Sequence, residues 1–463
     1  MTEQLKLKLN DSKATRWGAL VIVAFTMMAA YYVNDVVAPL KTMLETDLAW
    51  SSTDFGFFTG GYSFLNVFFL MLIWGGLILD RFGIRFTGKL ATILMVGGTA
   101  LEYYAMTGLA GADATLFGIN EIFGYKTGVF VAFAGYSIFG VGAEVAGITV
   151  SKIIAKWFKG KELATAMGVQ VALARIGSKA GYAVAIPLAR AFGISTPVLL
   201  GLVLLLGGMI AFFVFAVMDK KLDKQMEAAA IAAGTEDEEE KFSFKDVKNI
   251  LVNPGFWLIA LLCVLFYSCV FPFQKFASEL MIIKYGINEN VAGTFAGLPA
   301  LGALILTPVF GGFIDKRGKS ASIMLLGSAM LICVHFIYAI PDINYWLVAI
   351  VLMIILGIAF SLVPSAMWPA VAKIFPVSQL GTAYALIFFI QNIGLWGIPT
   401  LIGWVLDAYC ISGKKPDGTN MYDYTVPMCI FTGIACLSLI VALLLKKADK
   451  KYGYKLEEPN IQK

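Results

Sequence analysis

The sequence predicts an all-α membrane protein with twelve transmembrane helices in two six-helix bundles. Composition, long apolar segments and a repeated loop motif lead to this prediction. Of the 463 residues, 59% are hydrophobic and only 14% are charged, whereas a soluble domain has about 25% charged residues. Apolar segments of about 20 residues recur along the chain, and each can cross a hydrocarbon core.

The apolar segments define twelve predicted spans, so both termini lie on one side of the membrane. Lys and Arg accumulate in cytoplasmic loops. If the termini are cytoplasmic, the cytoplasmic segments and adjoining span ends hold 27 of these residues and the opposite loops hold 6. We therefore expect cytoplasmic termini. The predicted spans are 17–40, 53–79, 87–110, 128–153, 162–192, 196–218, 255–283, 291–314, 320–340, 345–372, 378–407 and 425–446.

The long connection after the sixth span divides the chain into two halves. We expect an N-terminal six-helix bundle over residues 1–218, a cytoplasmic linker over 219–254, and a C-terminal six-helix bundle with a cytoplasmic tail over 255–463. The linker contains the acidic run TEDEEE, which we interpret as solvated chain. The following FSFKDVKNIL predicts an amphipathic helix on the membrane surface.

A loop motif with glycine and aspartate follows both the second and the eighth span. The segments GGLILDRFGIR and GGFIDKRGKS share the pattern Gly-x-x-x-Asp-basic-x-Gly, about half the chain apart. Such an internal repeat is typical of secondary transporters. The duplication favours a cytoplasmic gate over a static turn, because the glycine permits close helix approach and the aspartate accepts hydrogen bonds at a helix end. The gate residues are Gly76, Asp80, Arg81, Gly83, Arg85, Gly311, Asp315, Lys316 and Gly318.

Charged side chains also occur inside the predicted spans, where each costs about 2.5–3.5 kcal/mol at mid-bilayer. Arg175 and Lys179 lie one helical turn apart and suit a carboxylate. Asp35 and Glu144, with aromatic faces, suit an ammonium group. We therefore expect a zwitterionic substrate bound by Asp35, Glu144, Arg175, Lys179, Tyr31, Tyr32, Tyr182, Tyr267, Gln274, Lys275, Trp368, Asn392 and Trp396.

Structural roles remain open for several of these charges. Glu144 and Arg175 could neutralise each other and fix the fourth span against the fifth. Lys179 has no obvious local partner in the sequence unless it is Asp35. Lys275 and the nearby Glu279 could instead extend from the outer end of the seventh span to water.

The doubled loop resembles the signature of the major facilitator superfamily. The segments YYVNDVVAPL, FGVGAEVAG and WFKGKELATAMGVQVALARIGS resemble its lysosomal dipeptide transporter family over about residues 30–185. This resemblance implies the major facilitator fold and uniport of dipeptides. It also implies that Asp35, Glu144 and Arg175 match the cavity charges of that family.

Other features indicate the setting of this chain. The Asn-x-Ser/Thr site at Asn10 lies on the predicted cytoplasmic side, and no acidic dileucine signal occurs near the N-terminus. We therefore expect a bacterial inner-membrane homologue. The sequence does not support an interaction with the accessory glycoprotein of the animal family. We expect a monomer whose partners are a small-molecule substrate and the lipid bilayer. We expect it to bind no nucleic acid, metal or other cofactor. Uniport and proton coupling both remain open, since Asp35, Glu102 and Glu144 could each carry a proton.

Other classes of function find less support. The chain has no phosphate loop, paired-histidine metal helix or nucleophile elbow, so we expect no enzyme. Cys410 and Cys429 flank one outer loop and could form a disulfide, although we favour the interpretation as two free thiols. The alternatives are an organic-anion facilitator, in which Arg175 and Lys179 bind two carboxylates, and a non-transporting membrane receptor.

Overall fold

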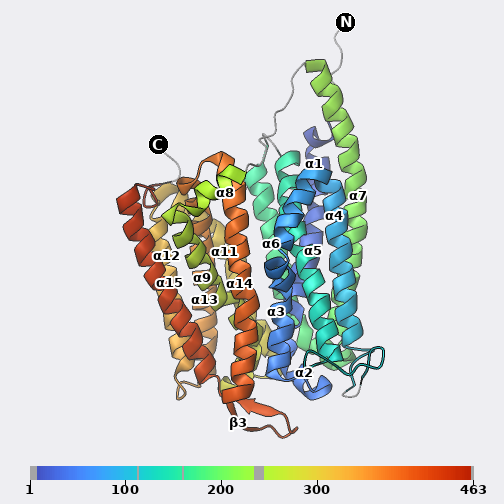
Figure 1. Cartoon of the computed structure of the whole chain (residues 1–463), viewed down its shortest axis with the longest axis vertical. Coiled ribbons are helices and arrows are strands. Elements are labelled where there is room, and N and C mark those ends of the chain that lie inside the picture. Colours follow the sequence, from blue (N-terminus) through green and yellow to red (C-terminus); the bar gives the residue numbers. More distant parts are fainter. Residues whose placement is uncertain (1–7, 112–113, 159–160, 234–243, 460–463) are drawn as a thin grey trace.

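The computed structural model describes residues 8–111, 114–158, 161–233 and 244–459. Figure 1 shows two groups of long helices lying side by side. The N-terminal group contains the short turns η1 (Leu9–Asp11) and η2 (Ala38–Leu40) and the helices α1 (Lys13–Val36), α2 (Lys41–Leu48), α3 (Ser52–Phe68), α4 (Met71–Ala105), α5 (Thr127–Trp157), α6 (Leu163–Phe192) and α7 (Thr196–Ala233). The C-terminal group contains α9 (Pro254–Tyr285), α10 (Glu289–Ala296), α11 (Leu298–Arg317), α12 (Ser320–Ala339), α13 (Trp346–Ile374), α14 (Val377–Tyr409) and α15 (Thr425–Tyr452).

Two small antiparallel hairpins join helices at one end of the bundle. Strands β1 (Glu121–Ile122) and β2 (Tyr125–Lys126) lie between α4 and α5, and β3 (Ile411–Lys414) pairs with β4 (Asn420–Tyr422) before α15. We call the end that holds α2 and the β3–β4 hairpin the hairpin end. The opposite end, where α1 begins at Lys13 and α15 finishes, is called the terminal end (Figure 1).

The prediction of an all-helical membrane protein is confirmed. Nine helices in the described ranges are long and apolar enough to cross a membrane, or ten if the bent pair α3 and α4 is one span. The total of twelve spans and the cytoplasmic position of the termini stay predictions.

The second predicted span, over residues 53–79, is divided between two helices. Leu70 adopts a left-handed conformation with a φ of 53°, so the helical hydrogen-bond ladder stops there. As a result α3 and α4 meet at an angle of 58°. Gly83, with φ 74° and ψ 174°, interrupts α4 where the second predicted span gives way to the third.

Part of the predicted linker belongs to a helix. Residues 219–233 continue α7, and Asp219 accepts hydrogen bonds from Lys156 Nζ at 2.8 Å and Trp157 Nε1 at 3.0 Å. The predicted amphipathic segment contains helix α8 (Phe244–Leu251). The acidic run TEDEEE lies outside the described residues.

The two groups pack closely through glycines on α3 and α14. A Cβ atom on Gly56 would lie 2.4 Å from the carbonyl oxygen of Pro399, and one on Gly403 would lie 2.2 Å from that of Ser52. Because no side chain intervenes, the two backbones approach closely, as small residues permit between membrane helices.

Candidate functional site

Opposite charges and aromatic rings from both helix groups meet in the interior of the bundle. We call this set the central cluster. Within the cluster, the side chains of Tyr31, Glu144 and Arg175 are partly exposed. The hydroxyl of Tyr31 lies close enough to Glu144 and Arg175 to interact electrostatically with both charges. The cluster comprises Tyr31 of α1, Tyr62 of α3, Glu144 of α5, Arg175 of α6, Tyr267 of α9, and Phe360 and Trp368 of α13.

A glycine one turn before Glu144 positions its partner. A Cβ atom on Gly140 would lie 2.0 Å from the backbone oxygen of Tyr62, so only glycine lets α3 approach α5 this closely. The hydroxyl of Tyr62 donates a hydrogen bond to Glu144 Oε1 at 3.0 Å. Tyr62 was not among the predicted site residues, although the glycines of FGVGAEVAG were a signal for a close helix contact.

Arg175 lies between aromatic rings from opposite groups. Its Cζ atom is 5.5 Å from the ring centroid of Tyr31 and 4.8 Å from that of Phe360, distances at which a cation interacts with the face of a ring. Within the described ranges, Arg175 has no ion pair with Glu144 or with another carboxylate. The structural alternative in which Glu144 and Arg175 neutralise each other is therefore not the arrangement in this conformation.

The C-terminal group contributes an aromatic wall to the central cluster. Trp368 Nε1 donates a hydrogen bond to the hydroxyl of Tyr267 at 3.3 Å. Tyr267 stacks on Phe271 with ring centroids 5.4 Å apart, and Trp368 stacks on Phe388 at 4.8 Å. Rings held by each other in this way can contact varied side chains without much rearrangement.

Asp35 and Lys275 come together as a pair between the two groups. Lys275 Nζ lies 3.4 Å from Asp35 Oδ1 and donates to the backbone oxygen of Asn34 at 2.5 Å. Ser178 Oγ also donates to the Asp35 carboxylate. Lys275 is 8% exposed, so the alternative in which it extends to water is wrong.

Three further predicted residues hold α6 against the C-terminal group. Lys179 Nζ donates to the backbone oxygen of Thr294 in α10. The hydroxyl of Tyr182 donates to the backbone oxygen of Gln274 at 3.3 Å, and the Gln274 side chain is itself buried. Lys179 therefore has a carbonyl as its partner, where the sequence suggested Asp35.

The remaining predicted residues contact other elements. The hydroxyl of Tyr32 donates to the backbone oxygen of Pro197 at 3.2 Å, which directs this side chain toward α7. Asn392 Nδ2 donates to the backbone oxygen of Phe388 at 2.9 Å. The ring of Trp396 packs edge-on against Phe68 at 4.7 Å.

A buried charge network at the hairpin end escaped the sequence analysis. Lys41 Nζ lies 2.5 Å from Glu279 Oε2 and also pairs with Glu45. Lys415 of the β3–β4 hairpin lies 3.3 Å from Glu45 and 3.4 Å from Glu279, and Tyr424 donates to Glu279 at 2.5 Å. Glu279 is therefore buried and paired, and the alternative in which it extends to water is wrong. We call these five residues the hairpin-end network.

Asp407 adds a second connection at the same end. Its carboxylate accepts from the backbone N–H groups of Ser52 at 3.3 Å and Thr53 at 2.5 Å, at the start of α3. A carboxylate is favoured at this position because the helix N-terminus carries partial positive charge.

The predicted gate motif has different contacts in its two copies. Asp80 pairs with Lys152 at 3.1 Å, and Arg85 pairs with Asp223 at 2.6 Å. A Cβ atom on Gly76 or Gly311 would meet nothing within 4 Å. The expected close helix contact at these two glycines is therefore absent from this conformation. Arg81 lies near the ring of Phe82, with its Cζ atom 5.5 Å from the centroid.

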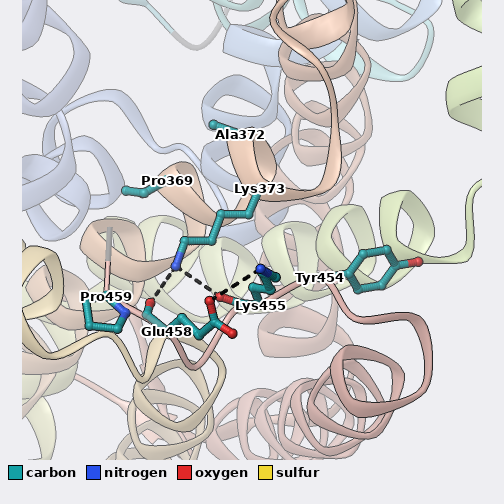
Figure 2. Close-up of a pocket in the computed structure, with 7 residues that line it drawn as sticks. All are labelled: Pro369, Ala372, Lys373, Tyr454, Lys455, Glu458 and Pro459. Atoms are coloured by element: carbon teal, nitrogen blue, oxygen red, sulfur yellow. Dashed lines mark hydrogen bonds and ion pairs between the residues drawn. The ribbon is translucent and has the colours of Figure 1, made fainter. Parts of the chain in front are cut away.

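The C-terminal tail covers the second copy of the motif. The backbone N–H of Lys319, next to Gly318, donates to the oxygen of Glu457 at 3.1 Å. Lys373 Nζ donates to the backbone oxygens of Lys455 at 3.1 Å and Glu458 at 2.6 Å, beside a pocket of about 440 Å³ (Figure 2). Asp315 and Lys316 lie in the last turn of α11, before this loop. The residues that line the pocket do not belong to the central cluster.

Ion pairs between the two groups occur at one end of the described structure. Besides Asp35–Lys275 and the hairpin-end network, Arg190 of α6 pairs with Glu289 of α10. The ion pairs at the terminal end, such as Arg16–Glu162 at 2.7 Å, each stay within one group. The conformation is therefore closed at the hairpin end. Cys410 and Cys429 are both free thiols.

Comparisons with known proteins agree with this architecture. A family model described as Major Facilitator Superfamily matches residues 20–399 and 276–458. The lysosomal dipeptide transporter MFSD1 of Homo sapiens is 29% identical over 95% of this chain and 88% of its own length. MFSD1 of Gallus gallus is 33% identical over 59% of this chain and 62% of its own length.

Solved structures of transporters share the fold. The nucleoside transporter NupG superimposes with a TM-score of 0.68 at 12% identity, covering 92% of this chain and 98% of its own. A bacterial homologue of the human lysosomal transporter Spinster, in an inward-facing and unoccupied conformation, gives 0.62 at 14% identity, with 98% and 99% covered.

Proposed function

Because this chain belongs to the Major Facilitator Superfamily, we propose that it moves dipeptides across a membrane by alternating access. The family and the named relatives make it a multi-pass membrane transporter and not an enzyme. The relatives are named as dipeptide transporters. The substrate of this chain and the coupling of its transport to an ion are therefore part of the proposal. For the membrane that holds the protein, we propose a bacterial inner membrane.

The observation that carries the proposal is the separation of Arg175 from Glu144. Both side chains belong to the central cluster, and no ion pair joins them in the part of the chain that the structure describes. The guanidinium of Arg175 would bind the substrate carboxylate through its planar pair of donors. Glu144, oriented by Tyr62, would bind the substrate ammonium group. The aromatic wall would contact the variable side chains of the dipeptide.

The contacts at the two ends support alternating access. With cytoplasmic termini, closure at the hairpin end makes this conformation inward-facing. Outward opening would require the Asp35–Lys275 pair, the hairpin-end network and the Asp407 connection to separate. The open space at Gly76 and Gly311 supports a gate that closes at these glycines in the opposite conformation, as the bundles 1–218 and 255–463 rock about the linker.

Coupling can be uniport or proton symport within this proposal. Glu102 is the group on which proton coupling depends, since it is fully buried and both of its carboxyl oxygens lack a hydrogen-bond partner among the described residues. A pH-sensitive dye inside proteoliposomes would report whether protons enter with dipeptides, and Glu102→Gln should abolish that signal if they do.

Counterflow in proteoliposomes tests the substrate. We expect a preloaded unlabelled dipeptide to drive uptake of a labelled one, with no exchange against dicarboxylates. Exchange of dicarboxylates without dipeptides would instead identify an organic-anion facilitator. A thermal shift by dipeptides without any flux would identify a receptor, because ligand binding stabilises the folded state by mass action.

A further inference from the structure

The segment between α4 and α5 displays two phenylalanine side chains away from the protein. Phe117 is 96% exposed and Phe123 is 88% exposed. Both adopt left-handed backbone conformations, with φ values of 54° and 53°. Bulky residues rarely adopt a positive φ, because this backbone conformation costs them about 1–3 kcal/mol. The chain therefore presents both rings at the cost of backbone strain.

The two phenylalanines occupy the same position in two consecutive tight turns. Leu116 and Ile119 exchange two backbone hydrogen bonds of 3.0 Å around Phe117 and Gly118. Ile122 pairs with Tyr125 around Phe123 and Gly124. Both glycines also have positive φ, 79° and 81°.

Turn formation does not explain the choice of phenylalanine. Two-residue hairpin turns with positive φ at both central positions strongly favour Asn-Gly or Asp-Gly. Here the favoured glycine is present twice, and phenylalanine stands twice where asparagine would be less strained. The requirement therefore lies in the rings and what they contact.

The base of the segment is attached firmly to the N-terminal group. Thr127 Oγ1 donates to the backbone oxygen of Ile119 at 2.8 Å, and Lys126 Nζ donates to that of Ala49 at 2.5 Å. The ring of Tyr125 stacks on Phe57 with centroids 3.9 Å apart. The phenylalanines are thus held in a fixed position, and Figure 1 shows this teal segment reaching sideways at the level of the helix ends.

Apolar side chains also lie at the ends of both flanking helices, next to the segment. Phe123 contacts the ring of Phe130 in the first turns of α5 at 5.9 Å. Leu101 and Tyr104 are exposed on the last turns of α4, just before the segment. Phe, Trp and Leu side chains on the apolar face of interfacial segments insert at the boundary between lipid headgroups and acyl chains. We propose that Phe117 and Phe123 insert into the lipid interface at the hairpin end and anchor the α4–α5 connection there.

Spin-label accessibility in proteoliposomes tests the insertion. The exposed Cys333, Cys429 and Cys436 are first replaced by serine, and a nitroxide is attached at Phe123→Cys. Tyr104→Cys provides the lipid-facing control, and Lys414→Cys on the β3–β4 hairpin provides the aqueous control. Frequent collisions of the nitroxide with oxygen indicate that it lies in lipid, and frequent collisions with a polar nickel chelate indicate that it lies in water.

We expect the label at position 123 to resemble that at 104, with oxygen favoured over nickel. Nickel accessibility like that at 414 would place the ring in water and overturn the proposal. Low accessibility to both reagents would indicate cover by protein and would overturn it equally. If Phe123→Cys fails to fold, Ile119→Cys in the same exposed segment provides the same readout.

Discussion

Arg175 combines a charge with an environment that leaves it available to a ligand. Its guanidinium faces Tyr31 and Phe360, one ring from each helix group. Cation–π contacts stabilise the side chain without using the donors that a carboxylate would need. A ligand bound there would touch both groups, which couples binding to their relative position.

Replacing Arg175 by lysine keeps the positive charge and removes the planar pair of donors. A lost hydrogen bond to a charged group costs about 1.5–3 kcal/mol, so we expect dipeptide counterflow to fall roughly 10- to 100-fold. Arg190→Lys is the matched control on the same helix, because Arg190 lies outside the central cluster and a lysine there keeps the positive charge that pairs with Glu289. Equal losses in both variants would argue against a substrate role for Arg175.

Tyr62→Phe removes the hydroxyl that donates to Glu144 and leaves the carboxylate without its partner. We expect the apparent KM for dipeptides to rise roughly 10- to 100-fold, because the loss of one hydrogen bond to a charged group costs about 1.5–3 kcal/mol. Tyr104→Phe, at an exposed position, should change the KM by less than about twofold. An unchanged KM in Tyr62→Phe would remove Tyr62 from the site.

Among the elements, α3 and α14 make a close backbone contact between the two groups. Gly56 and Gly403 face each other, and Asp407 accepts from the first turn of α3. The bend between α3 and α4 lies farther along the same span. This contact therefore supports closure at the hairpin end.

Gly56→Ala would place a methyl group 2.4 Å from the oxygen of Pro399. Such overpacking costs about 1–3 kcal/mol, so we expect a melting temperature lower by a few degrees and slower counterflow. Gly397→Ala on α14 is the matched control, because a Cβ atom there meets nothing within 4 Å. The melting temperatures of both variants are measured in detergent, and their counterflow rates are then measured in proteoliposomes. A Gly56→Ala protein as stable as wild type would refute the tight contact.

At the scale of the whole molecule, the hairpin-end network connects segments that are far apart in sequence. Lys41 and Glu45 come from α2, Glu279 from α9, and Lys415 from the β3–β4 hairpin. Removing one partner of a buried pair costs about 3–5 kcal/mol, because the other charge stays buried. The network therefore favours the conformation in which the hairpin end is closed.

Lys41→Met should shift the population toward opening at the hairpin end. Spin labels at the exposed positions Glu121 and Asp342, one in each group, would report this as an added longer distance in pulsed EPR. The double variant Lys41→Met/Glu279→Gln removes both charges of the pair and should recover most of the short distance. A distance distribution unchanged by Lys41→Met would show that the network does not hold this end closed.

Local sequence was sufficient for most helices and for several residues of the candidate site. The segment predicted over 128–153 lies within α5, because an apolar segment of that length forms a helix in lipid whatever surrounds it. Arg175 and Glu144 stood out because isolated charges are costly in spans. By contrast, Lys41 and Glu45 followed a predicted span and resembled ordinary loop residues.

The sequence by itself determined that the protein is an all-helical membrane protein. It also identified charged side chains within the spans, such as Arg175 and Glu144, that must point toward the interior of the bundle. Only the tertiary structure decided which charges pair, placing Asp35 with Lys275 and leaving Arg175 between two rings. The physical reason is distance along the chain: helix formation in lipid depends on the backbone of one segment, whereas an ion pair such as Lys41–Glu279 joins residues 238 positions apart.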